Sequence, residues 1–326
     1  MLKLVLIINS YKKILAHSID TNKVKLKKGK ILSREDIALL KDGGLEKIYI
    51  FDKSPHQIDE NEASFRLSKF IISNNIRINK PVNGRADLFA KKNGLLIYNK
   101  KLLYKLNYSN EDLAIAMMKT EEVVQKDQLI GNIKILPYAI NKKVLNKILN
   151  ENNYLNFIQV KKAKTRNIAL IISSDQENIK SNSKIINSIN LRLSKFDLKI
   201  KYILYCKHND NNIKNNLLSE KIKDSELVLL YGSTSIVDKN DIIPKALKKA
   251  KGKVISYGAP TDPGNLLMYG TLQNKKIIGV PGCAKSILRN GFDLVLEKAC
   301  FNFNINKKVI AELSYGGLFK HIIRKN

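Results

Sequence analysis

The chain has 326 residues, 44% of them hydrophobic, and its 58 Lys and Arg residues outnumber 29 Asp and Glu to give a net charge of +29. This length allows two or three domains, and the hydrophobic share excludes a wholly disordered chain. No apolar run approaches the roughly 20 residues that a membrane span needs. Three cysteines lie far apart without a CxxC pair, which fits a reducing compartment. We therefore expect a cytoplasmic protein with no membrane partner.

The positive charge has two explanations. It is typical of proteins that bind nucleic acid. However, lysine far exceeds arginine and is spread along the whole chain together with many Asn and Ile residues, as an A/T-rich coding sequence would produce. The chain also lacks zinc-finger spacing and an RNA-binding strand motif. The composition favours the second explanation, and nucleic-acid binding is kept as a remote alternative. Either way, the charge would attract small anionic ligands.

The first 52 residues predict a small β-rich unit with one helix. Ser33 is expected to cap that helix, with Asp36 as its partner in a capping box, and Gly43-Gly44 would end it. The expected strands are 14–19, 24–28 and 45–51.

Further along, apolar periodicity predicts more helices and strands up to a basic linker. Ser109, followed by Glu111 and Asp112, is expected to cap a helix over 109–118. The other expected elements are a helix over 58–73, two strands on either side of Gly131 within 123–137, a helix from Asn141 to Asn150 and a strand over 155–160. The run 161–166 is basic and lacks large apolar residues, so we place a domain boundary there. The expected domains are an α+β region over 1–165 and a second domain over 166–326.

From residue 166 onward, strands without polar alternation are separated by helices. The expected strands are 168–172, 200–205, 227–231, 254–257 and 277–280, and the expected helices are 184–193, 211–221, 241–250 and 292–301. Apolar strands of this kind are typical of a parallel sheet that helices cover on both faces. The sequence therefore predicts an α/β fold with a three-layer α/β/α domain and a mostly parallel sheet, preceded by a mixed α+β region.

One strand of this domain leads into a small, hydroxyl-rich loop. Gly232 ends the strand without a Cβ, which allows a ligand to approach the backbone. Ser233, Thr234 and Ser235 follow, and free N–H groups at the start of the next helix would suit a phosphate. The loop has neither the Walker A pattern nor GxGxxG.

Asp238 and Asp241 follow this loop, three residues apart, and are expected on the same side of a helical first turn. Such a pair could hold Mg²⁺ that bridges to a phosphate. Alternatively, the helix dipole alone favours acidic residues at that position. The spacing leaves both explanations open.

Two more tight loops follow later strands, Asp262-Pro263-Gly264-Asn265 and Pro281-Gly282-Cys283. Each by itself is only a turn signal. Because the carboxyl ends of parallel strands meet at one edge of a sheet, all three loops are expected to line one pocket.

The order of these loops resembles the molybdopterin-binding MoaB/Mog-like domain of molybdenum-insertion enzymes. The segments YGSTSIVDKND, DPGNLLMYG and GVPGCAKS are similar to a branch of the molybdopterin molybdenumtransferase family that is often fused to a cytidylyltransferase domain. The segments KILAHSI, NGRADLFA and GNIKILPYAI, and Tyr315-Gly316-Gly317-Leu318 near the carboxyl end, resemble the same branch, so the likeness covers nearly the whole chain.

This resemblance implies a protein of molybdenum cofactor biosynthesis that binds molybdopterin and takes part in molybdate insertion, with Mg²⁺ as cofactor. It implies catalytic and metal-binding roles for Asp238 and Asp241. The implied molybdopterin-binding residues are Gly232, Ser233, Thr234, Ser235, Asp262, Pro263, Gly264, Asn265, Pro281, Gly282, Cys283 and Ser286.

The chain departs from the family in two loops and lacks one motif. Ser233 stands where a second glycine is usual, and 173–177 stands where a TGDE-like turn is usual. A glycine-rich nucleotidyltransferase start is also absent from the sequence. The alternative function is therefore a non-catalytic molybdopterin carrier that works with a separate nucleotidyltransferase subunit. Whether the chain forms a homo-oligomer stays open.

Overall fold

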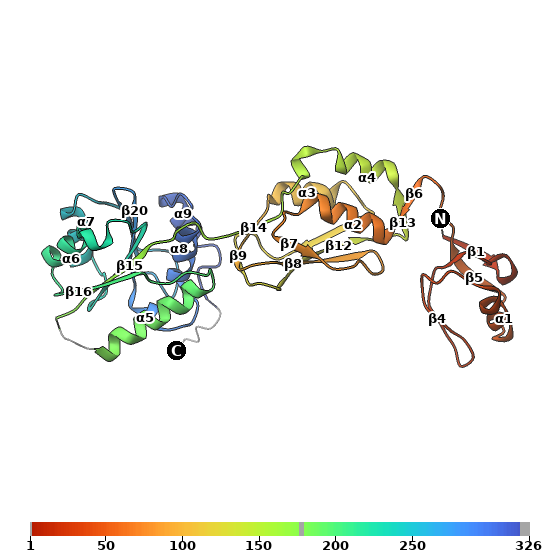
Figure 1. Cartoon of the computed structure of the whole chain (residues 1–326), viewed down its shortest axis with the longest axis horizontal. Helices are drawn as coiled ribbons and strands as arrows, with labels where there is room; N and C mark the ends of the chain where they lie inside the picture. The colour runs from red at the N-terminus through yellow and green to blue at the C-terminus, as the bar shows by residue number, and fades with distance from the viewer. Residues whose placement is uncertain (1, 176–178, 320–326) are drawn as a thin grey trace. The chain divides into compact units, whose positions relative to one another are not determined.

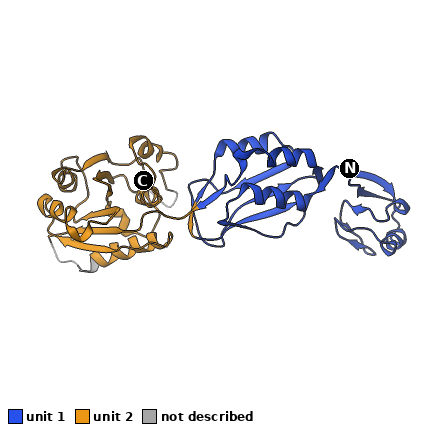
Figure 2. Ribbon diagram, turned by 45° about the horizontal axis from the view of Figure 1, so that its top comes forward, with its two compact units in different colours: residues 1–92, 96–160 blue, residues 93–95, 161–326 orange. Residues whose placement is uncertain are grey.

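The computed structural model describes residues 2–175 and 179–319, and their side chains except those of 179–181. The chain divides into two compact units (Figure 2). The first holds residues 1–92 and 96–160, and the second holds 93–95 and 161–326.

The first unit combines small sheets with helices (Figure 1). Up to residue 78 its elements are β1 (Leu2–Leu6), β2 (Ile14–Leu15), β3 (Ile19–Asp20), β4 (Lys25–Leu26), α1 (Arg34–Asp42), β5 (Lys47–Phe51), β6 (Gln57–Asp59), α2 (Glu60–Ile71) and β7 (Ile76–Ile78). The elements that follow are β8 (Arg85–Ala90), β9 (Gly94–Ile97), α3 (Lys100–Tyr108), β10 (Leu113–Met117), β11 (Val123–Val124), β12 (Leu129–Ile135), β13 (Ala139–Asn141), α4 (Lys142–Leu149) and β14 (Gln159–Lys161). The first two residues of β9 and the last residue of β14 are assigned to the second unit.

Capping explains where several of these helices begin. The predicted capping box of Ser33 and Asp36 is confirmed at the start of α1. Asn141 caps α4, as predicted, by accepting a hydrogen bond from the Lys143 N–H. These side chains satisfy N–H groups that the first helical turn leaves without partners.

The predicted helix over 109–118 is wrong. The helix lies earlier, in α3, where Asn99 accepts hydrogen bonds from the first N–H groups and Ser109 is the C-cap. Residues 113–117 form β10 instead, which pairs antiparallel with β12 and buries Leu113 and Ile115. The alternation of these apolar residues with period two outweighs the acidic residues before them.

Gly131 does not separate two strands, as the sequence suggested, but lies inside β12. The register between β12 and β8 shifts between Leu129 and Gly131, which marks an irregularity in the ladder. A Cβ at Gly131 would clash with the Met117 Sδ on β10. The glycine therefore permits close approach of the neighbouring strand and does not end its own.

The second unit contains a six-stranded mixed sheet in the order β16-β15-β17-β20-β19-β18. Figure 1 labels β15, β16 and β20 of this sheet. Its strands are β15 (Ile168–Ser173), β16 (Tyr202–Cys206), β17 (Leu227–Gly232), β18 (Lys253–Tyr257), β19 (Met268–Leu272) and β20 (Lys275–Gly279). The helices of this unit are α5 (Ile179–Ser194), α6 (Asp210–Leu217), α7 (Ile242–Lys249), α8 (Gly291–Cys300) and α9 (Lys307–Glu312).

Strand β19 is an element that was not predicted from the sequence. It pairs antiparallel with both β18 and β20, whereas β15, β16, β17 and β20 pair in parallel. Because β18 and β20 are each antiparallel to β19, both run in the direction of β17. The carboxyl ends of β17, β18 and β20 therefore meet at one edge of the sheet.

The central strands of this sheet are buried on both sides. Every residue of β15 and β17 is buried. On one side, a core cluster joins Ile171 and Leu230 with Ile213 of α6 and Leu247 of α7. Burial on both sides explains why these strands read as continuous apolar runs.

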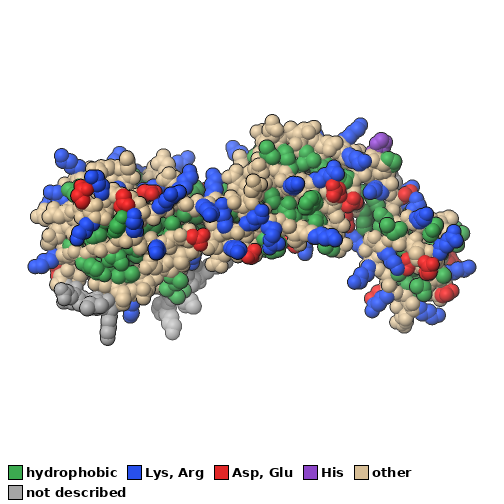
Figure 3. All heavy atoms as spheres, viewed as in Figure 1, with side chains coloured by type: hydrophobic (Ala, Val, Ile, Leu, Met, Phe, Trp, Pro, Cys, Tyr) green, Lys and Arg blue, Asp and Glu red, His purple; other side chains and the backbone are tan. Residues whose placement is uncertain are grey.

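Positive side chains occur over all parts of the face that Figure 3 shows.

None of the helices in the described part of the chain combines the length and the apolar character that crossing a bilayer would need.

Candidate functional site

The three loops predicted from the sequence lie in a row at the carboxyl edge of the sheet in the second unit. A Cβ at Gly282 would lie 3.7 Å from the Ser235 Oγ, so the loop after β20 adjoins the loop after β17. The Gly291 N–H donates to the Pro263 carbonyl at 2.9 Å, so the same segment also adjoins the loop after β18. The segment 281–291 therefore lies between the other two loops.

A buried histidine supports the loop after β17. His208 is 6% exposed and follows the end of β16. Its Nδ1 lies 2.8 Å from the Ser173 Oγ at the end of β15, and its Nε2 lies 2.9 Å from the Thr234 Oγ1. The Asp175 carboxylate accepts a hydrogen bond from the His208 backbone N–H at 3.1 Å. One imidazole thus connects residues that follow or end three neighbouring strands.

One tautomer of the neutral imidazole satisfies all of these partners. In it the Ser173 hydroxyl accepts from a protonated Nδ1 and donates to the Tyr231 carbonyl, which lies 3.4 Å away. The Nε2 is then an acceptor, and the Thr234 hydroxyl donates to it. Thr234 itself is exposed, so its oxygen keeps a lone pair that a ligand can reach.

Gly232 makes room for this histidine. A Cβ at residue 232 would lie 2.7 Å from the His208 Cε1 and 3.1 Å from the Ile243 Cδ1. From the sequence we expected a ligand to approach this glycine closely. The close neighbour within the chain is the imidazole.

The backbone of the same loop offers donors for an anion. The Ser233 N–H donates to the Ser173 carbonyl at 2.9 Å. The N–H groups of the next three residues, Thr234, Ser235 and Ile236, have no hydrogen-bond partner within the described residues. With the exposed hydroxyls of Ser233 and Ser235 nearby, several donors are concentrated on one short loop.

The next helix does not supply these donors, contrary to the expectation from the sequence. Helix α7 begins only at Ile242, and Asp241 is its N-cap. Asp238 lies in the turn before it and not in a helical first turn. The helix N-terminus is therefore separated from the serine loop by several residues and is capped by a carboxylate.

The carboxylates of Asp238 and Asp241 accept backbone hydrogen bonds within this turn and at the start of α7. Both oxygens of Asp241 accept backbone hydrogen bonds, Oδ1 from Ile242 at 2.7 Å and Oδ2 from Val237 at 3.1 Å. The Asp238 Oδ1 accepts from Asn240 at 2.7 Å. Within the described ranges, no three His, Cys, Asp or Glu side chains gather as a metal site would require. The pair fits a capped turn and does not by itself make a magnesium site.

The loop after β18 is held by the segment near the carboxyl end. The Asp262 N–H donates to the Gly317 carbonyl at 2.8 Å, and Asp262 forms a parallel bridge with Leu318. Gly264 has a φ of +115°, and a Cβ there would lie 2.6 Å from the Gly291 backbone nitrogen. Glycine is required at this point for both reasons. In the same loop Asn265 is exposed and Pro263 is half-buried.

A buried arginine holds the loop after β20. Arg192 of α5 is 3% exposed, and its Nε donates to the Asp293 Oδ1 at 2.9 Å. Its Nη2 donates to the Ser286 carbonyl at 2.7 Å and to the Leu288 carbonyl at 3.2 Å, and its Nη1 donates to the Ala284 carbonyl at 3.2 Å. One guanidinium thus fixes the backbone of this loop, because its planar donors are rigid relative to one another.

The cysteine of this loop remains a thiol at neutral pH. Burial raises the pKa of the Cys283 thiol above its ordinary value. A thiol that stays protonated is a poor nucleophile and a poor metal ligand. Cys283 therefore offers the site packing and backbone groups. Of the other predicted residues here, Pro281 is buried, whereas Gly282 and Ser286 are exposed.

The structure adds two residues that were missed from the sequence. His208 had one signal, its place just after an apolar strand, where α/β sheets bind ligands. Arg192 had another, because it lies three residues after Ile189 and seven after Ile185, on the helix face that those two residues bury. Of the departing turn 173–177, residues 176 and 177 lie outside the described residues.

Comparison with known proteins gives a family match over one segment only. Residues 11–52 match the model of a domain of unknown function, DUF8806. This segment falls within the small β-rich unit expected over 1–52. No curated protein matches the chain.

Several solved structures resemble the chain at low identity. One is a molybdenum cofactor biosynthesis protein from Pyrococcus furiosus, with 12% identity and a TM-score of 0.25 over 96% of this chain and 65% of that one. Another is the molybdopterin biosynthesis MoeA protein from Pyrococcus horikosii, with 14% identity and a TM-score of 0.31 over 74% of this chain and 80% of that one. A third is the protein CinA, of unknown function, from Thermoplasma acidophilum, with 14% identity and a TM-score of 0.24 over 38% of this chain and 92% of that one.

The three solved structures match different shares of this chain and of their own length. The chain spans 65% of the length of the Pyrococcus furiosus protein. At these identities and TM-scores, the solved structures carry no function over to this chain.

Proposed function

We propose that the chain binds molybdopterin at the carboxyl edge of the sheet in its second unit and takes part in molybdate insertion during molybdenum cofactor biosynthesis. The observation that carries the proposal is the meeting of three loops at that edge, those of Gly232, Asp262 and Pro281, in the order that resembles the molybdenumtransferase family. In this proposal the second domain, 166–326, is a three-layer MoaB/Mog-like domain, and 1–165 is the leading α+β region of that family. The protein acts in the cytoplasm.

The phosphate of molybdopterin would lie against the loop after β17. The N–H groups of Thr234, Ser235 and Ile236 are donors that the described chain leaves unused. The hydroxyls of Ser233 and Ser235 are exposed beside them. Consecutive backbone donors of this kind favour an anion without the need for a cationic side chain. This loop therefore takes the role that was expected of a helix N-terminus.

The pterin ring would lie along the row that the other two loops form. The implied contacts are with Asp262, Pro263, Gly264 and Asn265 of one loop and with Pro281, Gly282, Cys283 and Ser286 of the other. Both loops are held from outside the row, one by Gly317 and the other by Arg192. A rigid loop loses little conformational entropy when a ligand binds.

Magnesium and molybdate would lie at the turn before α7. Asp238 and Asp241 are the proposed residues for either, but three of their four carboxylate oxygens already accept backbone hydrogen bonds. Mg²⁺ is commonly bound by one or two carboxylates together with substrate phosphate, so the pair would act only with the ligand in place.

A test of catalysis is a molybdate-insertion assay with purified molybdopterin, molybdate and Mg²⁺. The proposal predicts formation of the molybdenum-bearing cofactor, and loss of that product but retention of molybdopterin binding in Asp238→Asn. If molybdopterin binds and no molybdenum is inserted with or without nucleotide, the protein is a carrier that serves a separate cytidylyltransferase subunit. If molybdopterin does not bind and affinity for nucleic acid falls steeply with salt, the basic surface carries the function instead.

A further inference from the structure

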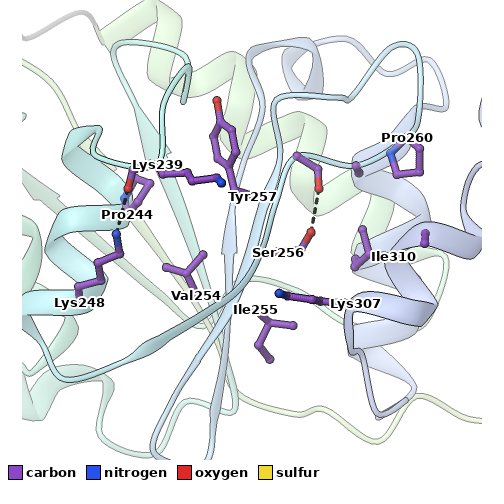
Figure 4. A pocket seen from close by; sticks show the side chains of 13 residues that line it. Lys239, Pro244, Lys248, Val254, Ile255, Ser256, Tyr257, Pro260, Lys307 and Ile310 are labelled. Atoms are coloured by element: carbon purple, nitrogen blue, oxygen red, sulfur yellow. Dashed lines mark hydrogen bonds between the residues drawn. The ribbon is translucent and has the colours of Figure 1, made fainter.

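A hollow of about 690 Å³ lies beside the edge strand β18, within the second unit. Figure 4 shows β18 passing between α7 and α9, with Lys239 and Lys248 on one side and Lys307 on the other. The residues 232–235 and 281–286 are not among those that line it, and only 258–260 lead from it toward the loop after β18. The hollow is therefore separate from the loop that offers donors to an anion.

The floor of the hollow is apolar and anchored to the core. Val254 and Tyr257 pack against the core cluster that α6, α7 and the sheet share. Pro244 of α7 and Ile310 of α9 are buried and line the two sides. Because these side chains belong to packed elements, the hollow is formed before any ligand arrives.

The charge around this floor has one sign. Lys239, Lys248 and Lys307 line the hollow, and among its described lining residues none is Asp or Glu. The Lys248 Nζ donates to the Lys239 carbonyl at 3.2 Å, and none of the three ammonium groups forms an ion pair with a described residue. By contrast, Lys249, on the same helix, has the Asp210 carboxylate 2.9 Å away.

Three like charges around a shared apolar surface favour one kind of occupant. An anionic group would reduce the repulsion between the ammonium groups, and lysine is a common ligand for phosphate. A ring would cover the apolar floor that Val254 and Tyr257 form; Figure 4 labels both side chains. The volume falls within the range of roughly 300–1,000 Å³ that is usual for small-ligand sites.

We propose that this hollow binds a small ring compound that carries a phosphate group. Lys239 and Lys248 reach the phosphate from the side of α7, and Lys307 reaches it from the side of α9. The ring lies on Val254 and Tyr257. This inference does not depend on the proposed binding of molybdopterin at the three loops.

The test is calorimetric titration of the full chain with 1-naphthyl phosphate as probe. The wild type is expected to bind the probe, and the variant Lys239→Gln, Lys248→Gln, Lys307→Gln is expected to bind it about tenfold more weakly or worse. Ser235→Asp, which changes the loop after β17 and not the hollow, is expected to keep the affinity of the hollow for the probe within about twofold. The matched control is Lys245→Gln, Lys253→Gln, Lys308→Gln, which removes equal charge from exposed positions of α7, β18 and α9 outside the lining. It is expected to keep wild-type affinity within about twofold.

Further arms separate the ring from the phosphate. 1-Naphthol and inorganic phosphate are each expected to bind more weakly than the joined probe, because each makes only one of the two contacts. Ala311→Glu places a negative charge at an exposed lining position and is expected to weaken the probe with little effect on folding. Equal loss of affinity in the matched control, or no probe binding to the wild type, would overturn the proposal. So would naphthol that binds as tightly as its phosphate.

Discussion

The Nε2 of His208 lies 2.9 Å from the Oγ1 of Thr234, and this contact joins the segment after β16 to the loop after β17. Because the other ring nitrogen meets Ser173, the imidazole fixes the start of the loop that offers donors to an anion. The contact gives the loop a defined shape without a helix behind it.

Removing the imidazole should loosen this loop. His208→Ala leaves the buried Ser173 hydroxyl and the Thr234 hydroxyl without their shared partner, so we expect a loss of about 1–3 kcal/mol in the free energy of unfolding. Thr234→Val should cost less, since Thr234 is exposed. Both variants should bind molybdopterin more weakly, as measured by equilibrium titration. Wild-type affinity in His208→Ala would show that the imidazole does not shape the site.

A methyl group at residue 232 should act through the same histidine. In Gly232→Ala the new Cβ would meet the His208 Cε1 at 2.7 Å, so we expect a loss of about 1–3 kcal/mol from overpacking. The double variant Gly232→Ala, His208→Ala should lose less than the sum of the two single changes, because the clash is gone. Additive losses in chemical denaturation would contradict this explanation of the glycine.

The buried guanidinium of Arg192 should be hard to replace. Arg192→Met leaves the Asp293 carboxylate, which is 4% exposed, without its ion-pair partner, and we expect a loss of about 3–5 kcal/mol. Arg192→Lys should not restore stability, because one ammonium cannot reach the Ala284, Ser286 and Leu288 carbonyls together. As a control, Arg66→Met breaks an exposed pair with Glu62 and should change stability by less than about 1 kcal/mol.

The three thiols should react slowly. Burial raises the pKa of Cys206 to about 11 and that of Cys300 to about 12, and it also raises the pKa of Cys283. Native protein should therefore react with iodoacetamide at pH 8 much more slowly than urea-unfolded protein, and the native rate should keep rising above about pH 9. Because the folded pKa values lie above the ordinary value, stability should fall as pH rises past about 9. A native rate that levels off near pH 9 would contradict the raised pKa values.

The fold was predictable from the sequence where one local rule decides the structure. The capping box of Ser33 and the cap of Asn141 depend on a few neighbouring residues, and both are present. The prediction failed at 109–118, where acidic residues suggested a helix start and pairing with β12 made a strand. Partners far apart in sequence decide such cases.

In the candidate site, too, some features could be predicted from the sequence and others could not. The loops at Gly232, Gly264 and Gly282 could be predicted from their turn residues, because glycine is favoured in tight turns. The residues that hold two of them, His208 and Arg192, come from other elements and meet the loops only through the fold. The start of α7 at Ile242 could not be predicted from the sequence either, because Asp238 and Asp241 are both favourable residues for a helix start.

The central claim is best tested by anaerobic equilibrium titration of the full chain with molybdopterin. We predict saturable binding to the wild type and binding about tenfold weaker or worse in Ser235→Asp, because the new carboxylate would repel the phosphate at an exposed position of the loop. The same loss of about tenfold or more on Ser235→Asp is expected in the Lys239→Gln, Lys248→Gln, Lys307→Gln background, in which the hollow beside β18 no longer contributes cations to a ring phosphate. Absence of binding to the wild type, or unchanged binding in Ser235→Asp, would contradict this claim.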